Sequence, residues 1–91
     1  MSGVADGVGW AQDGDAVVVA RFGSGDRVSL AGSAAVIWRL AAAGTDREAV
    51  VRTVQEHYDS DPEQIATAVR TTLDELVAQG LLRGDAATVQ R

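Results

Sequence analysis

The chain lacks cysteine and lysine, and only one histidine and one proline occur among its 91 residues. The absence of cysteine excludes disulfide bonds, thiol chemistry and metal sites built from thiolates, and it fits a reducing compartment. No apolar run reaches the roughly 18 residues that cross a membrane. The first residues, MSGVADG, have neither the basic nor the apolar segment of a secretion signal. We therefore expect a cytoplasmic protein without a membrane partner.

Positive charge is also scarce. The eight arginines are scattered along the chain and are outnumbered by 13 acidic residues, which gives a formal net charge of −5. Proteins that bind nucleic acids usually concentrate basic residues in one patch, because neutralisation of phosphates dominates their affinity. The composition therefore argues against DNA or RNA as a partner. The hydrophobic content of 46% is typical of a globular protein.

The residue types that enzymes use for catalysis are few. His57 falls near the end of a predicted helix, where a cation interacts favourably with the helix dipole. General-base catalysis needs a positioned partner and a pocket, and a metal site needs more ligands than one histidine. The Gly-Ser-Gly of residues 23–25 lacks the Lys-Ser/Thr that follows in a phosphate-binding loop. We expect no catalytic residue, no metal site and no cofactor.

The first half of the chain has the pattern of a three-stranded meander. Residues 8–11 alternate weakly, and Asp13-Gly14 is a favoured pair for a hairpin turn. Residues 15–22 form the clearest strand, and their run of valines predicts a central strand covered on both faces. After a turn at residues 23–26, the short strand Arg27–Leu30 lies at an edge of the sheet. Residues 1–7 are expected to fray.

The first predicted helix, residues 33–43, is the element around which the chain is organised. Its apolar stripe recurs at helical spacing, and Gly44 ends the helix because glycine readily adopts the left-handed conformation. Trp38 on this helix and Trp10 in the sheet are expected in the core. The stripe consists of Val36, Ile37, Leu40 and Ala41.

Two more helices are predicted after Gly44. Thr45 and Glu48 have the spacing of a capping box and predict the start of the second helix. Asp61 as N-cap and Pro62 as first helical residue predict the start of the third, which ends at Gly80. The third helix carries an apolar stripe of Ile65, Val69, Leu73, Leu76 and Val77, and the tail from Arg83 is expected to be loose.

The edge strand Arg27–Leu30 lacks the devices that usually protect such strands. An edge exposes unpaired backbone N–H and C=O groups, and proteins often blunt it with proline, lysine or a bulge. Neither proline nor lysine occurs here. Either the last residues or a loop cover this edge, or it is open to accept a strand from another chain. The sequence alone leaves both readings open.

The order and spacing of these elements resemble the PqqD-like family, whose small domains recognise precursor peptides of ribosomally made, post-translationally modified natural products. The resemblance covers about residues 8–83. It implies one α+β domain over residues 1–91, with a winged-helix-like fold of a three-stranded antiparallel sheet followed by three helices, and no catalysis. The matching residues are Leu30, Ile37, Trp38, Leu40, Gly44, Thr45, Val69, Leu73, Leu76, Gly80, Leu81 and Leu82.

In such proteins the leader segment of the precursor adds as a strand to the third β-strand and packs against the third helix. Carried over, the resemblance implies that the peptide-binding residues are Arg27, Val28, Ser29, Leu30, Val69, Arg70, Leu73 and Asp74. Two positions depart from the family pattern. Ala31 replaces a frequent asparagine after the third strand, and Ala68 replaces a frequent acidic residue in the third helix. These departures concern the polar contacts that a leader would make between the third strand and the third helix.

The resemblance also suggests partners. A chain of this kind looks most like the leader-binding protein of lasso-peptide systems, which works with a separate leader peptidase. A peptide chaperone for a radical enzyme, as in pyrroloquinoline quinone assembly, is the nearest alternative. A winged-helix DNA-binding protein would share the topology, but the acidic composition disfavours it. A dimerisation or scaffold module that uses the same open edge is a third reading.

Overall fold

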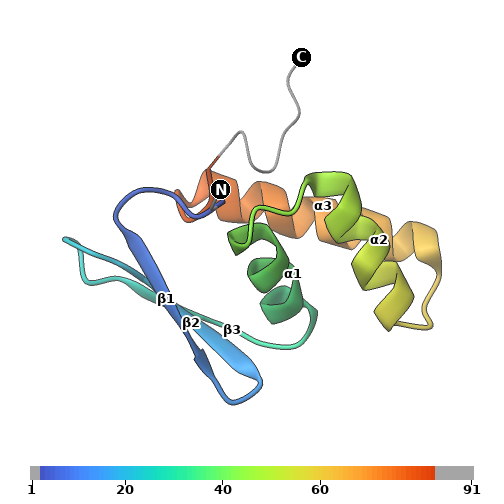
Figure 1. The fold of residues 1–91 in the computed structure, drawn as a ribbon, viewed down its shortest axis with the longest axis horizontal. Helices are drawn as coiled ribbons and strands as arrows, with labels where there is room; N and C mark the ends of the chain where they lie inside the picture. Colours follow the sequence, from blue (N-terminus) through green and yellow to red (C-terminus); the bar gives the residue numbers. More distant parts are fainter. Residues whose placement is uncertain (1–2, 84–91) are drawn as a thin grey trace.

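The meander predicted for the first half of the chain is present. The computed structural model describes residues 3–83, which form an α+β fold of three antiparallel strands followed by three helices (Figure 1). Strand β2 lies between its two sequence neighbours in the order β1-β2-β3. The elements are β1 (Val8–Asp13), β2 (Ala16–Arg21), β3 (Arg27–Leu30), α1 (Ser33–Ala42), α2 (Arg47–His57) and α3 (Pro62–Ala78).

Only one face of the sheet is covered. Val17 and Val19 of β2 are fully buried, while Val18, which points to the opposite face, is partly exposed. All three helices lie on the same side of the sheet (Figure 1). The expectation that the valine run is covered on both faces was therefore wrong for the described residues. A strand covered on one face usually alternates apolar and polar residues, and this alternation is missing here because the outer face carries small apolar side chains such as Val18 and Ala20.

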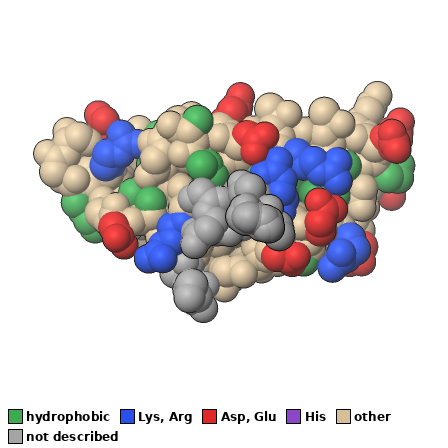
Figure 2. Space-filling view, turned by 90° about the horizontal axis from the view of Figure 1, so that it is seen from above, with side chains coloured by type: hydrophobic (Ala, Val, Ile, Leu, Met, Phe, Trp, Pro, Cys, Tyr) green, Lys and Arg blue, Asp and Glu red, His purple; other side chains and the backbone are tan. Residues whose placement is uncertain are grey.

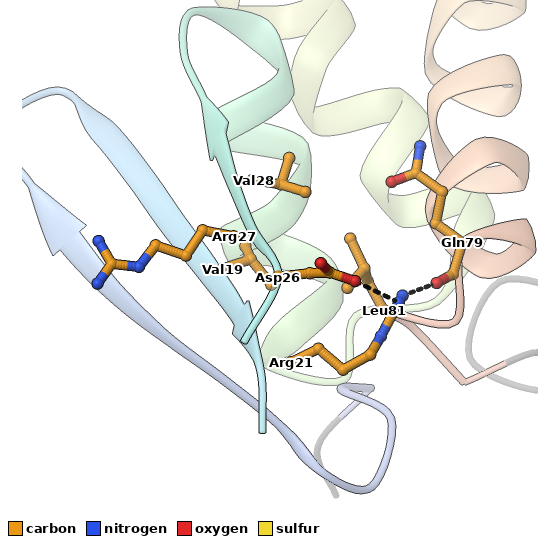
Figure 3. Close-up of a pocket in the computed structure, with 7 residues that line it drawn as sticks. All are labelled: Val19, Arg21, Asp26, Arg27, Val28, Gln79 and Leu81. Carbon is orange, nitrogen blue, oxygen red and sulfur yellow. Dashed lines mark hydrogen bonds and ion pairs between the residues drawn. The ribbon is translucent and has the colours of Figure 1, made fainter. Parts of the chain in front are cut away.

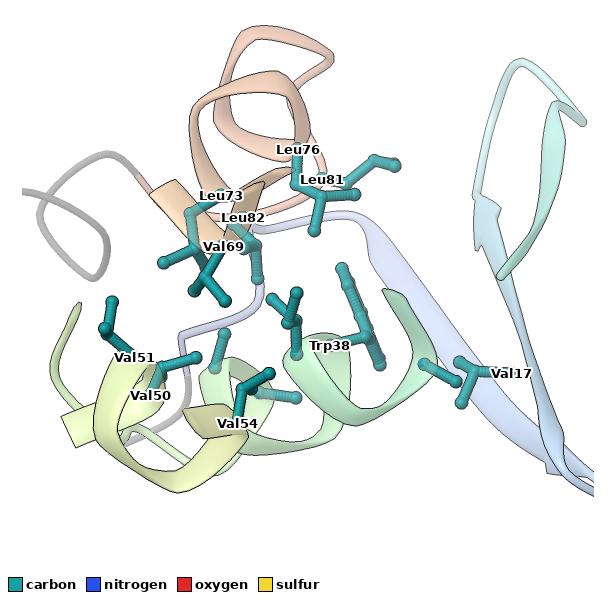
Figure 4. Packing of buried hydrophobic residues seen from close by; sticks show 14 of the residues in the cluster. Val17, Trp38, Val50, Val51, Val54, Val69, Leu73, Leu76, Leu81 and Leu82 are labelled. Carbon is teal, nitrogen blue, oxygen red and sulfur yellow. The ribbon is translucent and has the colours of Figure 1, made fainter. Parts of the chain in front are cut away.

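Helix α1 is the middle layer, and Trp38 is its central side chain. The indole is fully buried, and Figure 4 shows it between Val17 of the sheet and Leu81, which follows α3. Trp10 of β1 meets the indole edge to face, with ring centroids 6.2 Å apart and an angle of 77° between the planes. Trp10 remains 40% exposed, so only Trp38 is a core residue as expected.

The start of α3 follows the prediction and the start of α2 does not. The Asp61 carboxylate accepts a hydrogen bond of 3.0 Å from the Glu63 N–H, with Pro62 in the first turn. Helix α2 begins at Arg47, so its N-cap is Asp46 and the Thr45 capping box is not formed. Thr45 instead donates its backbone N–H to the Leu40 carbonyl, which completes the end of α1.

The N-terminal segment is paired rather than frayed over the residues described. Val4 and Leu82 form an isolated antiparallel bridge, and the Arg83 N–H donates to the Gly3 carbonyl at 2.8 Å. This pairing holds Leu81 and Leu82, which are each 2% exposed, against the core. The tail was expected to be loose from Arg83 on, but Arg83 itself is held by hydrogen bonds, and the residues after it lie outside the described residues.

Two ion pairs join α2 to α3. Arg47 pairs with Asp74 at 2.9 Å, and Arg70 pairs with Glu48 at 3.3 Å. The side chain of Arg47 is only 18% exposed because it lies against α3. Its hydrogen bond to Asp74 lowers the pKa of that carboxyl below its ordinary value.

This pKa shift predicts an acid-dependent contribution to stability. Because the pKa of Asp74 is lower in the folded than in the unfolded state, its contribution is present above the unfolded pKa and is lost as the pH falls through the folded pKa. Between about pH 4 and pH 2 the free energy of unfolding should therefore fall more steeply for wild type than for Asp74→Asn. Urea unfolding at stepped pH measures this, with Glu75→Gln as the matched loss of charge. Parallel curves for wild type and Asp74→Asn would contradict the role of this pair.

The buried stripe of α3 predicts a second effect. Leu73 is 1% exposed in the core, so Leu73→Asp places a carboxylate where nothing can solvate it. The expected cost is several kcal/mol, comparable with the roughly 5–15 kcal/mol by which small domains are stable. Circular dichroism should show no cooperative melting transition. The neighbouring exposed substitution Thr71→Asp should retain one, and a folded Leu73→Asp variant would disprove the burial.

Candidate functional site

The outer edge of β3 presents unpaired backbone groups. The Arg21 N–H donates to the Asp26 carbonyl at 2.9 Å, and the register pairs Val19 with Val28. Because antiparallel pairs alternate, Val28 and Leu30 direct their N–H and C=O groups toward β2. Arg27 and Ser29 direct theirs away from the sheet. Among residues 3–83, no strand pairs with this edge.

A groove with apolar and polar parts lies on the inner side of this edge. Its cavity of about 390 Å³ separates β3 from the C-terminal end of α3 (Figure 3). The apolar part of the lining comes from Val19, Val28 and Leu81, and the polar part lies at the end near the β2–β3 turn. We call this the β3–α3 groove, and its lining residues are Val19, Arg21, Asp26, Arg27, Val28, Gln79 and Leu81.

A second cavity of about 190 Å³ adjoins the N-terminal half of α3. Ala68 and Thr72 line it from α3, and they fall on the same flank of the helix as Gln79 of the groove. At 100° per residue these three positions lie within about 40° of one another around the helix axis. We call this the α1–α3 pocket, and its lining residues are Ser33, Ile37, Val54, Tyr58, Ser60, Ile65, Ala68, Val69 and Thr72.

The structure brings together only part of the predicted peptide site. Arg27–Leu30 form the open edge, with Val28 and Leu30 packed partly against the core. Val69 and Leu73 are each 1% exposed, so they belong to the core, and Val69 also lines the α1–α3 pocket.

Arg70 and Asp74 do not reach the groove. Both pair with α2, on the flank of α3 opposite to Thr72. The apolar stripe identifies the face of α3 that packs on α1, but it does not tell which polar flank faces α2 and which faces β3. The predicted site lacks five residues that line the groove, and it lacks Thr72 of the α1–α3 pocket. The five are Val19, Arg21, Asp26, Gln79 and Leu81. Ala68, which lines the α1–α3 pocket, could have been found from the sequence, because it stands where the family often has an acidic residue.

The arrangement offers backbone hydrogen bonds and apolar cavities rather than reactive groups. No group of three or more acidic or histidine side chains that could hold a metal occurs within residues 3–83. No helix in the described part of the chain is long and apolar enough to cross a membrane. On the face drawn in Figure 2, arginine and acidic side chains are interspersed instead of gathering into a basic patch.

The solved structure of TbiB1 in complex with the TbiA(beta) leader peptide is similar to this chain. The TM-score is 0.83 and the identity 27%, over 92% of this chain and 96% of that one. No curated protein sequence matches the chain. The family described as coenzyme PQQ synthesis protein D (PqqD) matches residues 16–82, which include β2, β3 and all three helices. The chain therefore belongs to the PqqD family.

Proposed function

We propose that this protein binds the leader segment of a ribosomally synthesised precursor peptide by strand addition to β3, and that it presents the peptide to a separate maturation enzyme. The observation that carries the proposal is the open edge of β3 beside the β3–α3 groove. Membership of the PqqD family and similarity to TbiB1, which is solved with a leader peptide, support it. On this proposal the protein is a recognition element and has no catalytic activity of its own.

Strand addition uses the alternation of β3. Arg27 and Ser29 exchange backbone hydrogen bonds with the leader, as the outward-directed residues of the strand. Leader residues opposite Val28 and Leu30 then place their side chains on the inner face, over the groove. The main-chain bonds supply sequence-independent affinity, and the cavities on the inner face supply specificity.

The helical wall of the site is the flank of α3 that carries Ala68, Thr72 and Gln79. These residues line the two cavities. Val69 contributes to the shape of the α1–α3 pocket, and Leu73 contributes by supporting the fold from the core. Arg70 and Asp74 hold α2 against α3 and contact the leader only if those ion pairs break.

The partner enzyme is, in this proposal, the leader peptidase of a lasso-peptide system. The description of the matched family as a coenzyme PQQ synthesis protein favours a second candidate, a chaperone that delivers a peptide to a radical enzyme. Both functions use the same leader site, and they differ in the enzyme that receives the peptide. The interspersed charges in Figure 2 and the net charge of −5 disfavour DNA binding.

Proline substitutions on β3 test the mechanism. Ser29→Pro removes an outward N–H, so we expect a folded protein whose affinity for the leader falls by at least about tenfold. Val28→Pro removes an N–H that bonds to β2, so we expect a destabilisation of about 1–3 kcal/mol or more. Thermal melting measures the stability of both variants, and calorimetric titration with the leader peptide of a cognate precursor measures their affinity.

Ser29→Ala is the matched control, because it keeps the backbone N–H and should bind like wild type. A folded Ser29→Pro variant with wild-type affinity would exclude β3 as the docking edge.

The helical wall is tested by two neighbouring substitutions. Thr72→Arg places a long cation in the α1–α3 pocket, so the affinity for the same leader should fall by roughly tenfold, about 1.4 kcal/mol. Thr71→Arg makes the same chemical change one position earlier, on an exposed part of α3 about 100° around the helix, and should leave affinity unchanged. Equal losses for the two variants would contradict this assignment of the wall.

A further inference from the structure

One residue joins the two walls of the β3–α3 groove at its end near the β2–β3 turn. The guanidinium of Arg21 lies 3.6 Å from the carboxylate of Asp26, which immediately precedes β3. The same guanidinium donates a hydrogen bond to the backbone carbonyl of Gln79, the C-cap residue of α3 (Figure 3). We call these three residues the Arg21 bridge.

The bridge places a cation between two negative groups. The last carbonyls of a helix have no partner within the helix and carry the negative end of its dipole, and Asp26 adds a full negative charge. The planar guanidinium has several N–H donors and can serve both groups at once, which a lysine ammonium on a flexible stem would do poorly. Arg21 is therefore neutralised from both sides, and its side chain is 37% exposed.

No second charge enters this end of the groove from β3. Arg27 lines the cavity, but its guanidinium extends to the opposite face of the sheet (Figure 3). The remaining side chains around the cavity are those of Val19, Val28 and Leu81, which are apolar, and the uncharged Gln79. A leader side chain opposite Val28 would lie on the same face as Val28 and enter this space.

We propose that the Arg21 bridge forms a subsite for the one leader side chain that lies opposite Val28, and that it selects a neutral, apolar side chain there. This inference rests on the proposed function. An acidic leader side chain competes with Asp26 for the guanidinium, and a basic one competes with Arg21 for the carboxylate. Either charge weakens the bridge that joins α3 to the sheet, so a neutral side chain is preferred to both.

Reciprocal charge variants test the subsite. The probe is a peptide selected from a phage-displayed random library for binding that Ser29→Pro abolishes and Ser29→Ala retains. Each position of this peptide is then replaced in turn by Leu, Glu and Lys. With wild-type protein, one inward-facing position should favour Leu over both Glu and Lys by about tenfold or more.

At that position the two variants should shift the preference in opposite directions. Asp26→Asn leaves the guanidinium without its carboxylate, so the penalty for Glu should fall by about fivefold or more while the penalty for Lys remains. Arg21→Gln leaves the carboxylate without its cation, so the penalty for Lys should fall instead. Arg83→Gln is the matched control. Arg83 also bonds to a backbone carbonyl and to an aspartate, at Val4 and Asp6, and should shift neither preference.

A purely structural role of Arg21 would weaken all peptides alike, and a uniform loss in both variants would overturn the proposed subsite. Asp26 is an exposed residue of the β2–β3 turn, so Asp26→Asn should stay folded. This variant therefore still tests the subsite if Arg21→Gln lowers the melting temperature too far for binding to be measured. A library that yields no binder sensitive to Ser29→Pro would instead overturn the proposed function, and the subsite with it. Binders sensitive to Ser29→Pro that show no reciprocal shift would overturn the subsite alone.

Discussion

Burial of Trp38 against the sheet is the constraint on which the rest of the fold depends. Its indole is fully buried, and its N–H finds no hydrogen-bond partner among the described residues, so apolar packing outweighs that cost. Because α1 occupies the inner face of the sheet, α2 packs on the far side of α1 and α3 runs across it (Figure 1). The end of α3 then lies across from β3 without covering its edge, and the groove follows from this spacing (Figure 1).

The local signals in the sequence predicted the elements well and their environments less well. The turns around β2 and the Asp61-Pro62 start of α3 depend on neighbouring residues only, and they are present. The capping box at Thr45 failed because the same residue also completes the end of α1, and one backbone cannot serve both ends. The coverage of β2 failed because burial on each face depends on where distant helices pack.

The candidate site depends even more on how distant elements pack, so less of it could be predicted from the sequence. Sequence spacing identified the edge strand. Whether Ser29 directs its backbone N–H away from the sheet depends, however, on how the turn closes through the Arg21 N–H and the Asp26 carbonyl. The apolar stripe of α3 has two polar flanks that look alike in sequence. Arg70 and Asp74 face α2, where Glu48 and Arg47 offer them opposite charges, and this complementarity can be recognised only when the two helices are placed together.

If the leader adds to β3 as proposed, the short length of this strand determines where the selectivity of binding must come from. Two outward-directed residues offer at most four backbone hydrogen bonds, which contribute about 0.5–1.5 kcal/mol each, so roughly 2–6 kcal/mol in all. Ordering four residues of a flexible leader costs about 1–2 kcal/mol each. These terms nearly cancel, so net affinity must arise from side chains that enter the groove and the α1–α3 pocket. On the proposed function, an open edge would permit binding of many extended peptides, and the residues on one flank of α3 together with the Arg21 bridge would decide which of them stay bound.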